Sequence, residues 1–175
     1  MELKSVTERF VLHWGEMGSR WGVNRTVAQI HALLYLAARP MHAEEIAETL
    51  GVARSNVSTS LKELQAWNLV RIVHIKGDRR DHFGTSTDVW ELFRLIVAGR
   101  RQREIDPTAA TLRECLDSPA IADEDAGTRR RIEATLRFIE VMSTLADEML
   151  RLKPETLMKT LGVAAKVSRT VRRNS

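Results

Sequence analysis

The chain has 175 residues, of which 43% are hydrophobic and 29% are charged, and its net charge is +4. This balance is typical of a folded globular protein and excludes a chain that is disordered for lack of apolar residues. The one cysteine excludes an intrachain disulfide. No stretch reaches the roughly 18 unbroken apolar residues of a membrane span, and the N-terminal residues mix acid and base. We therefore expect a cytoplasmic protein with no membrane partner.

Three helices are predicted in the first third of the chain. Residues 3–17 carry apolar residues at four-residue spacing. A second helix begins after Asn24, which can cap it, and stops near Arg39 because the following proline disfavours helical geometry in the residue before it. A short third helix over 43–51 has acids in its first turn, where the helix dipole favours them, and a glycine at its exit.

The most informative stretch is the next predicted helix, which follows a tight turn and ends at Asn68. Val57, Leu61 and Leu64 form one apolar stripe at i, i+4 and i+7. The remaining face is small, polar and poor in acid, and it suits a major groove about 12 Å wide. Residues 51–82 also hold six basic and three acidic side chains. The candidate DNA contacts on this helix are Arg54, Ser55, Asn56, Ser58, Thr59 and Lys62.

A β-hairpin is predicted directly after this helix. Residues 69–76 are rich in β-branched side chains and read as a strand, and a short return strand is expected near His82 and Phe83. The sequence KGDRRD would form the tip. Arg79 and Arg80 would then contact DNA phosphates or the minor groove, although a solvated turn with internal salt bridges is an alternative for this tip.

The remainder of the chain reads as helical. Asp88 and Glu91 form a pair resembling a capping box at the start of one helix. Asp106 and Pro107 are predicted to begin another, as its N-cap and first helical residue. Residues 118–127 are acidic and poor in large apolar groups, which predicts a loop.

A long helix is predicted to begin at Thr128. Its apolar residues follow a spacing close to a coiled-coil seam, and residues 129–152 carry more apolar surface than packing within one subunit requires. Pro154 is predicted to start a last helix, and residues 166–175 form a basic tail. The seam comprises Ile132, Ile139, Met142, Ala146 and Met149.

Together these elements predict a mainly α fold with a small β-hairpin wing. A winged helix-turn-helix DNA-binding domain over 23–87 would be joined to a helical dimerisation and effector region over 88–175. Residues 1–22 would form an N-terminal helix that contributes to the dimer contact.

The segment EEIAETLGVARSNVSTSLKELQAWNLVRIVHIKGDRRDHF resembles the winged helix-turn-helix of MarR-type transcriptional regulators. The segment GEMGSRWGVNRTVAQIHALLYLAARPMHAEEIAETLGVARSNVSTSLKELQ is similar to the GbsR-like subfamily of that group. The resemblance implies a cytoplasmic homodimer that binds a pseudo-palindromic site on double-stranded DNA, as a repressor or an activator. Repression by occupancy is the mechanism that we expect. Ala53 replaces a frequent Ser or Thr cap, at a cost of about 1 kcal/mol to the helix start, and Asn68 replaces a usual glycine.

Other classes of function find little support in the sequence. The histidines lack paired helical spacing and Cys115 has no ligand-like neighbour, so we expect no metal and no cofactor. No nucleophile elbow, phosphate loop or paired-carboxylate motif predicts an enzyme. A protein-interaction scaffold is the main alternative, but the helix face 54–62 lacks the large apolar anchors of a docking surface.

Trp14, Trp21 and Trp90 are candidate effector contacts. They flank the winged domain in sequence, where a bound ligand could bias the distance between the two DNA-reading helices. Indole faces suit a quaternary ammonium compound such as choline, which the GbsR resemblance suggests. The competing interpretation is that these rings fill the core, as we expect for Trp67.

Overall fold

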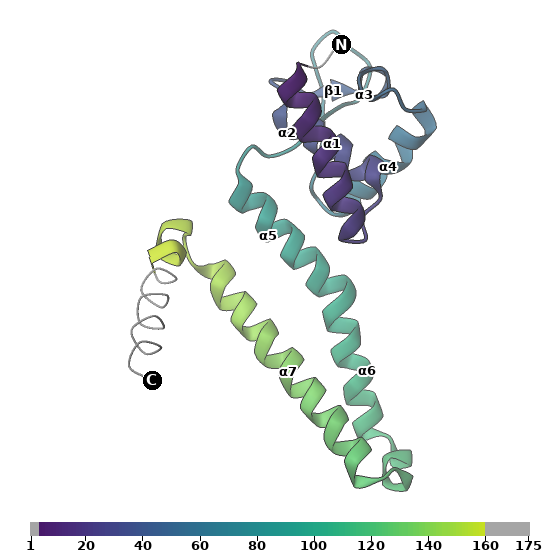
Figure 1. Cartoon of the computed structure of the whole chain (residues 1–175), viewed down its shortest axis with the longest axis vertical. Helices are drawn as coiled ribbons and strands as arrows, with labels where there is room; N and C mark the ends of the chain where they lie inside the picture. The colour runs from purple at the N-terminus through teal and green to yellow at the C-terminus, as the bar shows by residue number, and fades with distance from the viewer. Residues whose placement is uncertain (1–3, 160–175) are drawn as a thin grey trace. The chain divides into compact units, whose positions relative to one another are not determined.

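The computed structural model describes residues 4–159, which form two compact units that meet between Ile96 and Val97 (Figure 1). The sequence pattern predicts a boundary at residue 88, before the helix that follows the wing. The first part of the helix after the wing packs with the first unit, because Leu92 is buried in its core and Leu95 contacts the same cluster.

The first unit contains five helices and a small sheet. The helices are α1 (Ser5–Arg20), α2 (Arg25–Leu36), α3 (Ala43–Leu50), α4 (Arg54–Ala66) and the start of α5 (Val89–Arg100). The strands are β1 (Met41–His42), β2 (Arg71–Val73) and β3 (His82–Gly84). The predicted fold class, mainly α with a β-hairpin wing, is confirmed.

The core of this unit forms around α2 and α4. Ile30 and Leu33 of α2 are almost fully buried, and Asn24 caps this helix by accepting from the Thr26 amide at 2.8 Å. The stripe predicted on α4 is buried as expected, with Val57 and Leu61 both at most 2% exposed. Burial of this stripe fixes the rotation of α4 and thereby leaves its polar face toward solvent.

The helix α1 packs along α2 at two glycines. A Cβ atom on Gly15 would lie 2.6 Å from Gln29 Cγ, and one on Gly18 would lie 2.5 Å from Ala28 Cβ. Both distances are shorter than a normal van der Waals contact, so the two helices approach more closely than larger residues would permit. One face of α1 is therefore part of the first unit.

The sheet has three antiparallel strands in the order β1-β3-β2. Phe83 pairs with Met41 on one side and with Ile72 on the other, and His82 pairs with His42. The return strand near His82 and Phe83 is confirmed. The strand predicted over 69–76 is shorter in the structure, and β1 was not predicted because two residues are too few to show alternation.

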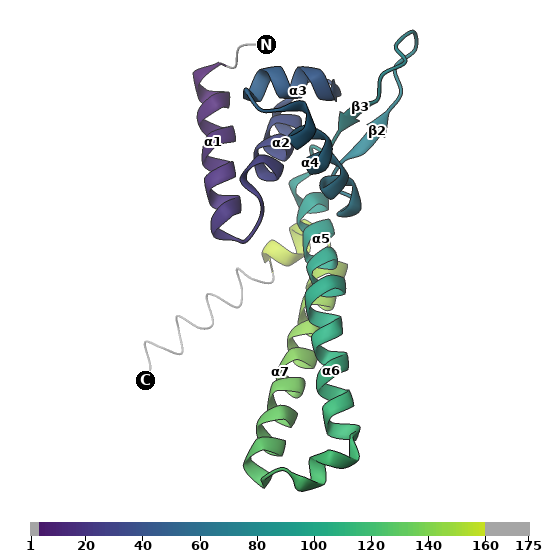
Figure 2. The same cartoon turned by 90° about the vertical axis from the view of Figure 1, so that its right-hand side faces the viewer.

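The second unit is a long antiparallel helical pair. The helix α5 leads through a π-helical segment (Arg101–Ile105) into α6 (Asp106–Asp117), and a 3₁₀ turn (Pro119–Asp123) connects to α7 (Ala126–Arg151). Figures 1 and 2 show α6 and α7 side by side, and Arg113 Nη2 of α6 lies 2.7 Å from Glu140 Oε1 of α7. The described part of a further helix begins at Pro154, as predicted.

The predicted helix start at Asp106 and Pro107 is confirmed in position, because α6 begins at Asp106, but Asp106 is not an N-cap. Asp106 has helical backbone angles (φ −62°, ψ −43°), and its amide donates to the Arg101 carbonyl five residues earlier. A proline in a helix interior has no amide hydrogen and its ring opposes the carbonyl four residues earlier, and here a π-helical segment directly precedes Pro107. The helical run therefore continues through the proline.

At the start of α5, Asp88 caps the helix as predicted, but Glu91 does not bond to the Asp88 amide directly. Asp88 Oδ1 accepts from the Trp90 amide at 2.8 Å, as a cap should. The Asp88 amide donates to Ser86 Oγ, and the Ser86 hydroxyl donates to Glu91. Ser86 thus stands between the two members of the expected box.

Within the described residues, no helix is both long and apolar enough to span a bilayer. The same part of the chain contains no group of three His, Cys, Asp or Glu side chains that could hold a metal ion. The basic tail predicted at 166–175 lies outside the described residues.

Candidate nucleic-acid interface

The helix-turn-helix is formed by α3, a short turn and α4. Gly51 ends α3 in the left-handed region (φ +63°), and the Val52 amide donates to the Ala47 carbonyl at 3.1 Å. This arrangement reverses the chain in few residues and satisfies the last carbonyls of α3. Ala53 occupies the N-cap of α4 and provides no side-chain cap, as its sequence implied.

The other end of α4 is closed by a residue with positive φ. Trp67 occupies the C-cap, and Asn68 adopts φ 57°. Asparagine tolerates this conformation better than most residues because its short amide can bond locally. The chain then turns directly into β2, so the hairpin begins beside α4.

The polar face of α4 lies toward solvent. Its side chains offer hydroxyl and amide groups plus two cations, and the acid Glu63 is also exposed at the margin of this face. The predicted contacts on α4 thus share one accessible surface, with only Ser58 half-buried. The exposed members are Arg54, Ser55, Asn56, Thr59 and Lys62.

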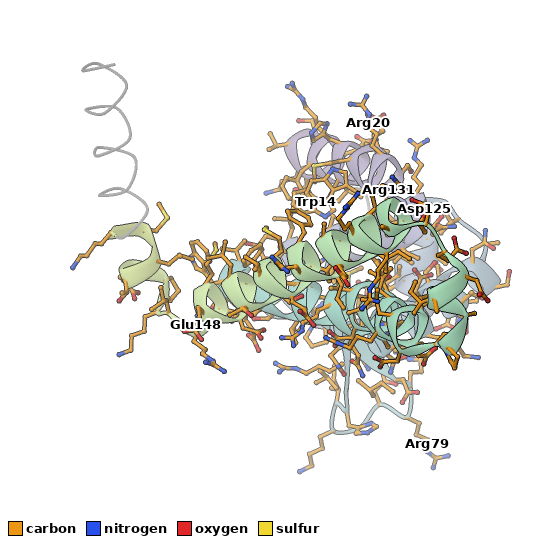
Figure 3. The ribbon with its side chains drawn as sticks, turned by 90° about the horizontal axis from the view of Figure 1, so that it is seen from below. Trp14, Arg20, Arg79, Asp125, Arg131 and Glu148 are labelled. Atoms are coloured by element: carbon orange, nitrogen blue, oxygen red, sulfur yellow. The ribbon has the colours of Figure 1, made fainter. Side chains whose placement is uncertain are left out.

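The wing extends away from the helices (Figure 2). Gly77 turns the chain at its tip with φ +88°, a conformation that favours glycine. Arg79 is exposed, and Figure 3 shows its side chain projecting outward from the end of the hairpin. Arg80 behaves differently, because Asp78 binds it.

Asp78 and the Arg80 guanidinium form a bidentate ion pair. Arg80 Nε lies 2.9 Å from Asp78 Oδ1, and Arg80 Nη2 lies 2.5 Å from Oδ2. These bonds, with the Arg80 amide, hold the pKa of Asp78 far below its usual range. This finding agrees in part with the alternative of a salt-bridged tip, while leaving Arg79 exposed.

A second ion pair crosses the turn of the helix-turn-helix. Arg54 Nε of α4 lies 2.8 Å from Glu44 Oε1 of α3, and this contact lowers the pKa of Glu44 to about 2. Both side chains remain about half exposed. A phosphate that bound Arg54 would therefore compete with a carboxylate already in place.

Arg54, Lys62 and Arg80 line one cavity between the helices and the wing. Its volume is about 320 Å³, and the apolar residues Leu61 and Phe83 also line it. Three cations from two different elements thus face a common concave surface. The acids Glu44 and Asp81 also line this cavity, so its positive charge is partly offset in the free protein. A polyanion that fits between α4 and the wing would interact with the cations in competition with these carboxylates.

Several residues at this surface were not identified from the sequence. The Asp-x-Arg spacing in the wing is a local signal from which the Asp78–Arg80 pair could have been found. Glu44 and Arg54 are ten residues apart on different helices, so their pairing depends on the tertiary fold. Gln65 also lines the cavity, one turn beyond Lys62.

The structure does not bring the three candidate effector tryptophans together in a described cavity. Trp14 stacks on Phe10 with 5.3 Å between ring centroids, and Trp90 makes an edge contact with Phe93 at 6.2 Å. Trp21 is 66% exposed just after α1. The three cavities that we describe in residues 4–159 are lined by other side chains.

A helix-turn-helix followed by a β-hairpin defines the winged helix-turn-helix class of domain. Residues 21–81 match the family model described as MarR family. One solved structure, described as a crystal structure of a transcriptional regulator, aligns with a TM-score of 0.64 and 21% identity over 83% of this chain and 95% of that chain. This similarity supports the fold.

Two Bacillus subtilis (strain 168) proteins also match. The chain is 26% identical to the HTH-type transcriptional repressor OpcR over 45% of this chain and 42% of the relative. It is 24% identical to the HTH-type transcriptional repressor GbsR over 54% of this chain and 52% of the relative. The chain spans about half the length of the curated relatives it matches. The resemblance to MarR-type regulators, including GbsR, is confirmed by these matches at low identity.

Proposed function

We propose that this protein is a transcriptional regulator that binds double-stranded DNA in a sequence-specific manner. The observation that carries the proposal is the shared surface of α4 and the wing, where Arg54, Lys62 and Arg80 line one cavity beside a slim polar helix face. A duplex presents phosphates on both sides of a groove that accepts one helix. The arrangement suits insertion of α4 into the major groove with the wing against the adjacent backbone.

The side chains divide into two roles in this proposal. Asn56 and Lys62 are exposed on α4 and have the reach to hydrogen-bond base edges, adenine and guanine respectively. Arg79 at the wing tip contacts phosphate or the minor groove and fixes the register of the protein. The short side chains of Ser55, Ser58 and Thr59 hydrogen-bond to base edges or to phosphates.

We further propose that the protein acts as a homodimer on a pseudo-palindromic site. Phe138, Val141, Met142 and Leu145 of α7 are each between 46% and 65% exposed and follow i, i+3, i+4 and i+7 spacing. A monomer rarely exposes a continuous apolar stripe of this kind. Two copies paired through this stripe would present two recognition helices to half-sites about one helical turn apart.

Repression is the regulatory direction that we propose, because two of the matched relatives are named as repressors. A regulator that occupies a promoter site can exclude the transcription machinery without further chemistry. The proposed function includes no enzymatic activity. A regulator of this kind would act on DNA in the cytoplasm.

A quaternary ammonium effector is a separate proposal. It rests on the resemblance to GbsR and on the indoles of Trp14, Trp21 and Trp90, of which Trp21 is the most exposed. Titration of tryptophan fluorescence with choline tests it. No change at millimolar choline in fluorescence or in DNA affinity would end the effector proposal and leave DNA binding intact.

A protein-docking scaffold is the alternative function. Such a surface needs large apolar or aromatic anchors, whereas the accessible face of α4 presents small polar groups and cations. The experiment that separates the two functions is to sequence the genomic DNA fragments that the purified protein retains. Enrichment of a common two-fold motif supports the proposal, whereas retention of no fragment at low salt contradicts it.

A further inference from the structure

His42 lies where three structural elements meet. It belongs to β1 and is the N-cap residue of α3, where its Nδ1 lies 3.2 Å from the Glu45 amide nitrogen. The same Nδ1 lies 3.2 Å from Glu44 Oε2. On the other side of the ring, Nε2 lies 3.0 Å from Nη1 of Arg80 in the wing. One imidazole thus connects the start of α3 with a cation of the proposed DNA interface.

The hydrogen atoms of the ring limit which of these contacts can coexist. A neutral imidazole has one donor nitrogen and one acceptor nitrogen, and a guanidinium can only donate. Arg80 therefore requires Nε2 to be the acceptor, which places the ring hydrogen on Nδ1. In that tautomer Nδ1 donates to Glu44 and cannot accept from the Glu45 amide.

The opposite tautomer caps α3 but places an N–H against Arg80. Nδ1 then accepts from Glu45, while Nε2 and Nη1 become two donors that face each other. A protonated ring carries hydrogen on both nitrogens, so it keeps only the bond to Glu44. The neutral ring can therefore either accept from the Glu45 amide and cap α3 or accept from Arg80, but it cannot do both. A protonated ring can do neither.

Charged groups surround the ring from each neighbouring element. Glu44 and Glu45 lie on α3, and Glu45 is also paired with Arg39 at 2.5 Å. In the wing and β3, Asp78 binds Arg80, and the His82 ring lies edge-on to His42 with 5.6 Å between centroids. Arg80 is thus bound from two sides, by a carboxylate of its own hairpin and by the imidazole of His42.

We propose that His42 is a positioning residue for Arg80 in DNA binding. Asp78 and Arg80 are both in the hairpin, so their ion pair alone cannot fix the guanidinium relative to α3 and α4. The bond to His42 supplies that link and keeps Arg80 at the cavity that Arg54 and Lys62 also line. This inference rests on the proposed function, because it concerns the contribution of Arg80 to DNA affinity.

The test is a double-mutant cycle with His42→Thr and Arg80→Ala on a mixed-sequence duplex at low salt. Threonine can cap α3 but is too short to reach Arg80, and thermal melting of each variant verifies the fold. We expect His42→Thr to weaken binding about threefold to tenfold with Arg80 present, the effect of one ordinary hydrogen bond, and to have no effect in Arg80→Ala. An equal effect in both backgrounds overturns the inference.

Rescue by a side chain that can still accept a hydrogen bond provides a readout that a purely structural role would not change. His42→Gln retains an amide oxygen that can accept from Arg80, so it should keep more of the coupling than His42→Thr. Equal loss of coupling in both variants overturns the inference. Absence of duplex binding by the unmodified protein would instead contradict the proposed function, so the two failures are distinguishable.

Discussion

Glu44 on α3 and Arg54 on α4 are joined across the turn of the helix-turn-helix, with Arg54 Nε 2.8 Å from Glu44 Oε1. The pair fixes the first cation of the recognition helix in the free protein. It also places a carboxylate beside a surface that, in our proposal, approaches phosphate. DNA binding must therefore either break this ion pair or accommodate its negative charge.

Replacing Glu44 with Gln should tighten binding to a mixed-sequence duplex several-fold. The substitution removes a negative charge and releases Arg54 for phosphate. Glu48→Gln provides the matched control, since it removes an exposed acid from the same helix. Fluorescence anisotropy with a labelled duplex measures the effect. If both variants gain equally, net charge rather than release of Arg54 explains the change.

Reading and anchoring residues should differ in how they change specificity. Asn56→Ala or Lys62→Ala should relax preference at particular base pairs, with about 1–3 kcal/mol of discrimination lost per good contact. Arg79→Ala should weaken binding to all sequences alike. Competition assays with a panel of single-base operator variants make the comparison. A changed base preference only in Arg79→Ala would reverse the assigned roles.

The buried histidine of α2 should make the domain sensitive to acid. Burial lowers the pKa of His31 from 6.5 to about 4, and its Nε2 lies 3.3 Å from Thr85 Oγ1, which itself donates to the Leu69 carbonyl. Below about pH 6.5 the unfolded chain binds a proton that the folded chain does not, so stability falls as pH decreases toward 4. The full loss is about 3 kcal/mol.

Chemical denaturation at several pH values measures this loss. His31→Gln retains a donor toward Thr85 but cannot titrate in this range, so its free energy of unfolding should depend less on pH. A pH dependence identical to that of the unmodified protein would assign the effect to other groups.

A charge in the apolar stripe of α7 should disrupt the dimer. Phe138→Glu places a carboxylate in the proposed contact, and we expect the dimer dissociation constant to rise by at least about a hundredfold, since a buried unpaired charge costs several kcal/mol. Thr144→Glu, at an exposed position of the same helix outside the stripe, is the control. Sedimentation equilibrium reports the result. A Phe138→Glu protein that remains fully dimeric would place the interface elsewhere.

The sequence predicted the winged domain well because its signals are local. The stripe Val57, Leu61 and Leu64 fixes how α4 packs, and Gly51 marks the end of α3 within a few residues. The rotation of α4 then determines which polar residues are accessible. The recognition face could therefore be identified before any tertiary contact was known.

The sequence was less informative where distant residues or unusual turns determine the structure. The π-helical segment before Pro107 allows a helix to continue through a residue that ordinarily begins or ends one. The pairs that Glu44 and His42 form depend on the fold bringing α3 close to α4 and the wing. These contacts determine which cations of the interface are already engaged, and spacing along the chain does not encode them.

Salt dependence of DNA affinity tests the central claim most directly. Each phosphate neutralised contributes about −0.9 to the slope of log K against log salt concentration. We predict a steep negative slope for the dimer on a genomic fragment that it retains, reduced in magnitude by about 2 when Arg79→Ala removes one contact from each subunit. Arg137→Ala, at an exposed arginine of α7, should leave the slope unchanged. A flat response between low and moderate salt would contradict DNA binding by α4 and the wing.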